Sequence, residues 1–216
     1  EFSEAINCAT RTLIFCETVE SSELIRDELV QKGVSVGNYH SRLTSREQEN
    51  ILDGLGSGRF KCVVAVRALD EGIDVPDIDF GIIISGSRQK RQMIQRMGRV
   101  LRKKIDNRNA CFAIVYAEGT TEDPSLEARD EGNLSLIIDN ADHVNDFSGN
   151  KITASSFAAV VSRSIFENRH KTEISETLET TVPDLNQDSL EGKKIIMFME
   201  GKQANDGGDY LSEMWG

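Results

Sequence analysis

The sequence predicts an α/β fold built on a doubly wound parallel sheet. Short, almost continuous apolar runs of five to seven residues recur through the first half of the chain. Such runs are typical of strands that are buried on both faces of a parallel sheet. Segments whose apolar residues repeat at helical spacing separate these runs. Alternating strands and helices favour right-handed crossovers with helices on both faces of the sheet.

The apolar runs place five strands, at residues 12–16, 34–39, 61–66, 80–84 and 110–116. The segment between the first two runs, residues 18–32, carries apolar residues on one helix face. Gly33 follows it at the position where a glycine commonly ends a helix. We therefore expect a helix over residues 18–32 that returns the chain to the second strand.

The segment between the second and third strands predicts another helix. Thr44 or Ser45 can cap its amino end, and Glu47 or Gln48 stands at the position of a capping box. The apolar residues that follow are spaced along one helix face, and we expect the helix to run to about Gly56.

Charge is spread unevenly along the chain. The net charge of −11 divides into −2 for residues 1–125, with 17 basic and 19 acidic groups, and −9 for residues 126–216, with 8 and 17. Residues 88–108 hold nine basic groups and one acidic group, and residues 89–103 predict a basic helix. The composition excludes a simple polybasic binder, but a groove that touches phosphates locally remains compatible with it.

The composition changes near Gly119, where the chain becomes acidic and polar. We expect a domain at residues 1–119 and an acidic, partly helical extension at residues 120–216. In the extension we expect one or two helices within residues 126–147, a helix within 152–170, and a strand or short helix at 194–199. Our main interpretation is a solvated appendage packed on the domain. The alternative is a regulatory element that competes for a nucleic-acid groove.

Cysteine, histidine and apolar content limit the function classes further. The four cysteines are far apart, without a CxxC pair, and only three histidines occur, so we predict no metal site. We interpret the cysteines as reduced, mostly buried thiols of a cytoplasmic protein. No run of 18 or more apolar residues and no secretory leader is visible, and we expect no membrane partner.

An acidic loop follows the third predicted strand. It carries Asp70, Glu71, Asp74, Asp77 and Asp79, with Gly72 and Pro76 among them. Ligands of open parallel sheets bind beyond the carboxyl ends of the strands, so these side chains are expected where a site would be. The simpler alternative is an acidic surface loop with a glycine turn.

The predicted basic helix holds a second candidate constellation. Arg99 and Arg102 are three residues apart and therefore share a helix face, and Gly98 removes side-chain bulk beside them. Two guanidinium groups on one face suit a polyphosphate, because each can donate two parallel hydrogen bonds. The alternative is a solvated basic face paired with acidic neighbours. A third segment, residues 39–49, contains His40, which we interpret as a turn residue without a catalytic role.

Four segments in order carry a family resemblance: TLIFCET (12–18), YHSRLTSREQ (39–48), VAVRALDEGIDVPD (64–77) and QRMGRVLR (95–102). They resemble motifs IV, IVa, V and VI of the second RecA-like domain of superfamily 2 helicases, over about residues 5–118. The forms of motifs V and VI look most like the bacterial and archaeal relatives of the xeroderma-pigmentosum group B DNA repair helicase. The resemblance implies a RecA-like fold and a motor function.

The resemblance also implies roles near a nucleotide. Arg99 and Arg102 match the arginine fingers that reach the γ-phosphate of ATP across the cleft between two domains. Gly72 and Asp74 match the motif V pair, and Gln95 matches the first position of motif VI, near the nucleotide. ATP and Mg²⁺ would be bound mainly by the first RecA-like domain of the same protein, which is an implied partner.

Nucleic acid is the other implied partner. By resemblance, His40, Arg67, Ser87 and Arg88 lie towards the nucleic-acid strand. DNA is favoured over RNA, because Gln95 stands where the RNA-specific DEAD-box branch has a histidine.

The chain lacks the other half of the phosphoryl-transfer machinery. No GxxxxGK[ST] loop and no DExH or DEAD run occurs in the sequence. We therefore expect the second motor domain of a helicase or translocase, without ATP hydrolysis of its own. One alternative is a non-motor scaffold or binding module with a RecA-like fold, which an unrelated upstream domain would support. Another is a small-molecule enzyme with its site at residues 70–79, although no nucleophile or cofactor loop accompanies it.

Overall fold

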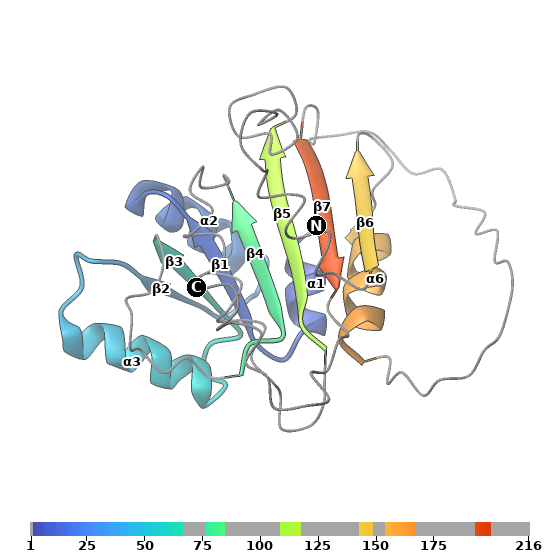
Figure 1. Cartoon of the computed structure of the whole chain (residues 1–216). Helices are drawn as coiled ribbons and strands as arrows, with labels where there is room; N and C mark the ends of the chain where they lie inside the picture. The colour runs from blue at the N-terminus through green and yellow to red at the C-terminus, as the bar shows by residue number, and fades with distance from the viewer. Residues whose placement is uncertain are drawn as a thin grey trace, which may run out of the picture.

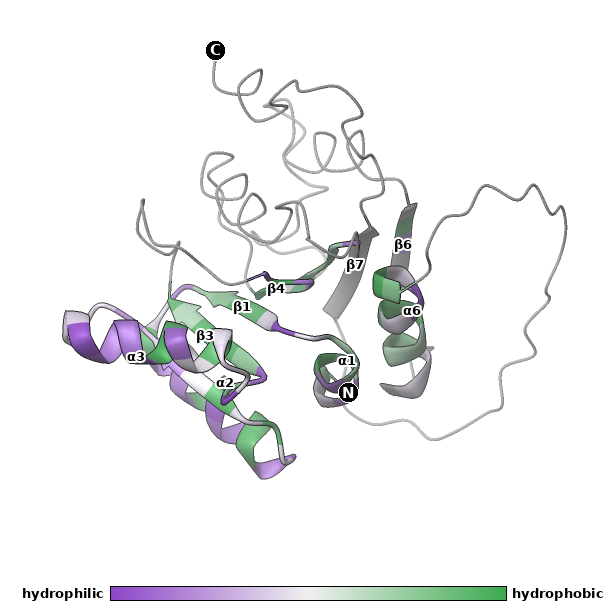
Figure 2. Ribbon diagram, turned by 90° about the horizontal axis from the view of Figure 1, so that it is seen from below, coloured by the Kyte–Doolittle hydropathy of each residue, from purple (hydrophilic) through white to green (hydrophobic). Residues whose placement is uncertain are grey.

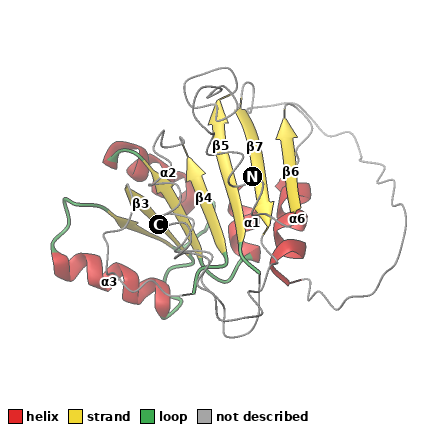
Figure 3. Cartoon of the chain, in the orientation of Figure 1, coloured by secondary structure: helices red, strands yellow, loops and turns green. Residues whose placement is uncertain are grey.

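The computed structural model describes residues 2–66, 77–84, 109–117, 143–148, 154–166 and 193–199. These residues form a seven-stranded sheet with helices on both faces (Figures 1 and 3). Across the sheet the strands are β2 (Val36–Tyr39), β3 (Cys62–Val66), β1 (Thr12–Cys16), β4 (Phe80–Ile84), β5 (Cys111–Ala117), β7 (Lys193–Met199) and β6 (His143–Ser148). The five strands expected in the first half of the chain are all present.

The first five strands form the parallel part of the sheet. β1 lies in its middle and pairs in parallel with β3 on one side and β4 on the other. β2 continues the sheet beyond β3, and β5 continues it beyond β4. Every residue of β1 is buried, which explains why this strand is apolar without alternation. The predicted α/β fold with a RecA-like parallel sheet is therefore confirmed.

Helix α2 (Val19–Gln31) connects β1 to β2. The Thr18 hydroxyl accepts a hydrogen bond of 3.0 Å from the Ser21 backbone N–H, which satisfies a donor that the first helical turn leaves free. Gly33 adopts a φ of +79° just after the helix, a conformation that side chains with a Cβ rarely adopt. The predicted helix and its glycine stop are both confirmed.

Helix α3 (Ser45–Gly56) connects β2 to β3 and begins with the predicted capping box. The Thr44 hydroxyl accepts from the Glu47 backbone N–H at 3.3 Å, and the Glu47 carboxylate accepts from the Thr44 backbone N–H at 2.8 Å. The side chain of Arg11 lies at the other end of the helix. Its guanidinium donates to the carbonyl oxygens of Leu55 at 3.0 Å and Gly56 at 2.8 Å, in the last turn, where carbonyl groups lack N–H partners further along the helix.

The helices cover opposite faces of the sheet and define two cores. On one face, residues of α2 and of two further helices, α1 (Phe2–Cys8) and α6 (Ala154–Phe166), pack against the sheet. On the other face, Leu52 and Leu55 of α3 pack on Leu13, Phe15 and neighbouring strand residues. Figure 2 shows hydrophobic strands β1 and β3 beside an α3 that carries many hydrophilic residues. This two-faced arrangement is what a doubly wound sheet requires.

The acidic extension contributes two strands and a helix to the same body. β7 pairs antiparallel with β5, and β6 pairs antiparallel with β7 (Figure 1). The segment at 194–199 is therefore a strand, one of the two forms we expected. Helix α6 lies within the predicted range 152–170. The helices expected within 126–147 fall mostly outside the described residues, and the described part, 143–148, is a strand.

Helix α1 is an element that the sequence did not predict. Its seven residues include only two buried ones, Ala5 and Ile6, so the segment is too short to show a helical period. The helix packs on α6, where the rings of Phe2 and Phe157 meet edge to face with centroids 5.3 Å apart. Its place therefore depends on a helix more than 150 residues further along the chain.

None of the helices in the described part of the chain is long and apolar enough to cross a membrane. The predicted basic helix at residues 89–103 lies outside the described residues.

Candidate functional site

The candidate site lies at the carboxyl edge of the parallel sheet, where ligands of this fold class bind. β1 and β3 end level with one another, since Cys16 pairs with Val66. Beside them, Phe15 pairs with Ile83, so β4 ends at the same edge. The chain leaves this edge after Val66 and after Ile84, into the segments that carry the predicted motifs V and VI. The sheet thus brings together the strand ends from which the chain continues towards both motif segments.

Most of the predicted site residues lie outside the described residues. This applies to all of the following: Arg67, Gly72, Asp74, Ser87, Arg88, Gln95, Arg99 and Arg102. Of the predicted set, only His40 is described. The roles proposed for the others remain predictions.

His40 follows β2 directly and is 9% exposed. Its carbonyl oxygen accepts hydrogen bonds from the Leu43 backbone N–H at 3.2 Å and from Gln48 Nε2 at 3.1 Å. These bonds fix the turn between β2 and α3. The His40 Nδ1 atom is buried and has no hydrogen-bond partner among the described residues. His40 thus acts as a turn residue through its backbone, as we expected, and its side chain keeps one unused polar atom.

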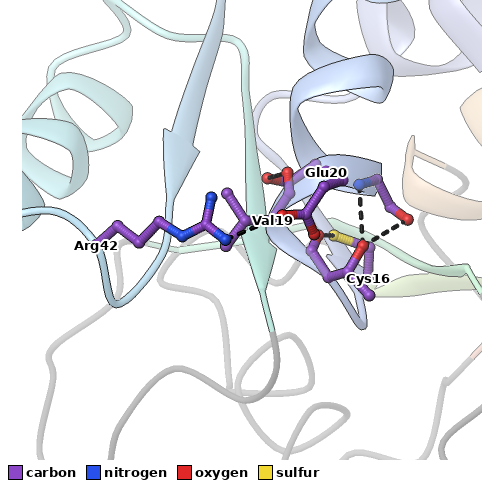
Figure 4. A network of polar contacts seen from close by, with 7 residues as sticks. Cys16, Val19, Glu20 and Arg42 are labelled. Atoms are coloured by element: carbon purple, nitrogen blue, oxygen red, sulfur yellow. Dashed lines mark hydrogen bonds and ion pairs between the residues drawn. The ribbon is translucent and has the colours of Figure 1, made fainter.

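An ion pair at this edge joins motif IVa to the first turn of the helix that follows motif IV. The Arg42 Nη2 atom lies 2.9 Å from Glu20 Oε1, and Figure 4 shows Arg42 reaching from the loop after β2 towards the first turn of α2. Both side chains are largely exposed, at 64% and 67%. The sequence singled out neither residue as a partner of the other, because 22 residues separate them.

The pKa of the Glu20 carboxyl lies below its ordinary value. The main cause is a hydrogen bond from the backbone N–H of Glu20 itself, and the hydrogen bond from Arg42 adds to it. The position of Glu20 in the first turn of α2 explains this backbone donor, because the first N–H groups of a helix have no helical acceptor. Glu20 is therefore held by its own helix as well as by Arg42.

Asp79 corrects the prediction that the whole acidic loop lies at the site. Its carboxylate is fully buried at the opposite, amino edge of the sheet, just before β4. There it accepts hydrogen bonds from the backbone N–H groups of Thr10, at 2.9 and 3.0 Å, and Arg11, at 2.9 Å. The chain has crossed the sheet by the end of the loop, so Asp79 supports the fold and is remote from the candidate site.

The cysteines match the prediction of reduced, mostly buried thiols. All four are free, and Cys16, Cys62 and Cys111 are buried. Burial raises the pKa of the Cys62 and Cys111 thiols well above the ordinary value, because the interior disfavours the charged thiolate. In the part of the chain that the structure describes, no group of three or more His, Cys, Asp or Glu residues could hold a metal ion.

The fold and the motif order agree with a comparison against known families. Residues 3–104 match the family model described as the helicase conserved C-terminal domain. Residues 3–104 are a helicase C-terminal domain. The resemblance to the second RecA-like domain of superfamily 2 helicases is confirmed. The matched range includes all four motif segments and ends before β5.

Curated relatives of this helicase C-terminal domain include the expected XPB-type proteins and, unexpectedly, UvrABC system protein B. The DNA 3'-5' translocase XPB2 of Sulfurisphaera tokodaii is 40% identical over 35% of this chain and 17% of its own length. The putative DNA 3'-5' helicase Rad25 of Haloarcula marismortui is 32% identical over 56% of this chain and 18% of its own. UvrABC system protein B of Mycoplasma mycoides is 28% identical over 87% of this chain and 29% of its own.

The similarity to UvrABC system protein B was not predicted, and it is informative about the extension. An alignment over 87% of 216 residues exceeds the 119 residues of the predicted domain, so it includes part of the extension. The chain spans less than a third of the length of each of these three curated relatives.

Among solved structures, the E. coli DEAD-box protein SrmB, bound to regulator of ribonuclease activity A, is similar with 21% identity and a TM-score of 0.42. That match covers 46% of this chain and 63% of that one. The Pyrococcus furiosus Hef helicase domain is 31% identical with a TM-score of 0.35, over 42% of this chain and 18% of that one.

Proposed function

We propose that this chain is the second motor domain of an ATP-dependent DNA helicase or translocase. The observation that carries the proposal is that β1, which contains most of motif IV, and β3, in which motif V begins, end level with each other. β4, after which the chain continues towards motif VI, ends at the same edge of the sheet. Four motifs in family order, with two of them starting from strands that end at one edge of a parallel sheet, suit a site that acts on a ligand between two domains.

In this proposal, Arg99 and Arg102 are arginine fingers for an ATP that the first RecA-like domain holds. ATP, which the first domain would hold with Mg²⁺, would supply the γ-phosphoryl group, which passes to a water molecule as ADP leaves. The two guanidinium groups stabilise negative charge that develops on the γ-phosphate, an effect of about 10³–10⁵ in rate where an arginine finger has been measured. Gly72, Asp74 and Gln95 line the nucleotide side of motifs V and VI.

The carboxyl edge of the sheet, where β1, β3 and β4 end level, is the surface that would face the first domain in this proposal. Closing of the two domains on ATP would then bring a first domain against that edge.

DNA is the proposed nucleic acid. The names of the relatives XPB2 and Rad25 both specify DNA, and Gln95 departs from the histidine of the RNA-specific branch. His40, Arg67, Ser87 and Arg88 are the proposed contacts to the strand. Phosphates are reached by local positive charge, of which residues 88–108 hold nine groups against one acidic group. A role in DNA repair would follow from the resemblance.

The arginine fingers can be tested in the full-length protein. Arg99→Ala or Arg102→Ala should lower the turnover of ATP at least tenfold at an unchanged melting temperature, because each change removes a charge needed in the transition state. Arg26→Ala is a matched control, since Arg26 is a partly exposed arginine on α2 whose partner is Asp27. Turnover that stays at the wild-type rate in both variants would favour the scaffold alternative.

A further inference from the structure

Arg42 and Glu20 stand at the proposed nucleic-acid edge, and neither has an assigned role. Glu20 lies in the first turn of the helix that follows β1, and Arg42 lies in the loop that follows β2. These strands end within one residue of each other in register, because Tyr39 pairs with Ala65 and Cys16 pairs with Val66. A strand of DNA that runs along the carboxyl edge would therefore pass both side chains.

The loop holds the backbone of Arg42 firmly while its guanidinium group stays accessible. The turn that contains Arg42 is closed by the two hydrogen bonds to the His40 carbonyl, and the capping box fixes the residue that follows Leu43. Glu47, the nearest acidic alternative along the chain, is committed to Thr44, whose hydroxyl donates to the Glu47 carboxylate at 2.7 Å. Among the described residues, Glu20 is the acidic partner of Arg42.

The ion pair between Arg42 and Glu20 is suited to a change of partner, in which a phosphate replaces the Glu20 carboxylate. Ion pairs between two exposed side chains contribute little to stability, because water screens them and ordering two long side chains costs entropy. A phosphate can accept two parallel hydrogen bonds from a guanidinium group, which a single-oxygen contact at 2.9 Å does not use. Glu20 can release Arg42 at small cost, because its own backbone N–H, at the amino end of α2, still stabilises its carboxylate.

We propose that Arg42 contacts nucleic acid, and that Glu20 occupies its guanidinium group when no nucleic acid is bound. A backbone phosphate displaces the Glu20 carboxylate from the Arg42 guanidinium when a DNA strand enters the edge. Glu20 thereby lowers the affinity of the free protein for nucleic acid, by occupying the arginine that the phosphate needs. This inference rests on the proposed function, because it assumes that a strand runs along this edge.

A double-mutant cycle separates exchange from simple charge repulsion. In the full-length protein without nucleotide, binding of a fluorescein-labelled oligothymidylate is measured by anisotropy over a range of salt concentrations. Glu20→Gln should tighten binding about threefold, since it frees the arginine without adding a new contact. Arg42→Gln should weaken binding about fivefold and lower the salt slope by about 0.7, the value for one phosphate contact on a single strand.

The decisive variant combines both changes. If Glu20 acts through Arg42, Glu20→Gln has no effect once Arg42→Gln is present. Asp27→Asn is the matched control, because it removes the same charge from another exposed ion pair of α2, and it should leave binding unchanged. Arg42→Lys should be intermediate, as it keeps the charge but loses the planar fork.

Two results would overturn the inference while leaving the proposed function intact. One is a gain from Glu20→Gln that persists in the Arg42→Gln background, and the other is an equal gain from Asp27→Asn. Absence of oligothymidylate binding by the wild-type protein would instead contradict the proposed function, and the inference with it. Because the three substituted side chains are exposed, melting temperatures close to that of the wild type are expected and would verify folding.

Discussion

Asp79 illustrates how position in the fold decides the role of a residue type. Five carboxylates crowd into residues 70–79, and sequence alone places them together at the strand end. The structure buries Asp79 completely and gives its carboxylate the backbone N–H groups of Thr10 and Arg11. A buried charge is tolerated only when such donors surround it. Asp79 thereby fixes the turn that leads into β1, the central strand of the parallel part.

Asp79→Asn should destabilise the domain by about 2–4 kcal/mol. The amide replaces one acceptor oxygen by an NH₂ group that faces backbone N–H donors, so a buried donor loses its partner. The free energy of unfolding from urea titration measures the loss. Asp77→Asn, a change in the partly exposed neighbour, should stay within about 0.5 kcal/mol. Equal effects at both positions would show that the hydrogen bonds of Asp79 are not what stabilises the turn.

Residues that depend on local geometry were predicted, and those that depend on distant partners were not. The capping box of Thr44 and Glu47 and the left-handed Gly33 need only a few neighbouring residues, and the structure confirms them. The contact of Glu20 with Arg42 requires two strand ends to be level, which the sequence does not specify. Local pattern singled out the acidic loop and the pair Arg99 and Arg102, whereas their specific roles came from the resemblance to known motifs.

At the scale of elements, apolar patterning located strands and helices but not their partners. The parallel strands were predicted because burial on both faces leaves a continuous apolar run. The position of β7 beside β5 was not predicted, since pairing across more than 70 residues leaves no local signal. Helix α1 was missed because its seven residues are too few to show a helical period. Its burial depends on Phe157 of α6, against which Phe2 packs.

Helix α6 offers a direct test of whether the extension belongs to the core. Phe157 is 1% exposed and its ring also lies 6.4 Å from that of Phe80 on β4, whereas Phe166 on the same helix is 49% exposed. Phe157→Ala should therefore cost about 3–5 kcal/mol, through lost burial and the cavity that remains. Phe166→Ala is the matched control and should cost less than about 1 kcal/mol. Thermal and urea unfolding distinguish the two variants.

The unfolding measurements on the two α6 variants have two possible outcomes. A large loss confined to Phe157→Ala means that residues beyond 119 stabilise the sheet in solution. Similar small effects at both positions would mean that α6 does not pack on the helicase C-terminal domain, contrary to its buried contacts.

For the whole molecule, the change from near-neutral to acidic sequence does not mark the end of the sheet. The acidic part of the chain supplies β6, β7 and α6 to the sheet that the near-neutral part begins. The similarity to UvrABC system protein B likewise continues past residue 119. We infer that the proposed boundary at residue 119 separates the residues that carry the motifs from residues that complete the same sheet. The alternative is two units that fold independently, and proteolysis distinguishes these two arrangements.

Limited proteolysis of the whole chain should leave a core that retains α6 and β7. Removing residues 120–216 would strip β7 from β5 and uncover the buried side chains that Phe157, Val161 and Ile165 cover. A bare strand edge beside exposed apolar surface favours aggregation, so a chain cut at residue 119 should be less stable and less soluble than the whole chain. Mass spectrometry of the digest and the melting temperature of the shortened chain measure both effects. A stable fragment ending near residues 119–129 would show that the extension does not pack and that the helicase C-terminal domain folds without it.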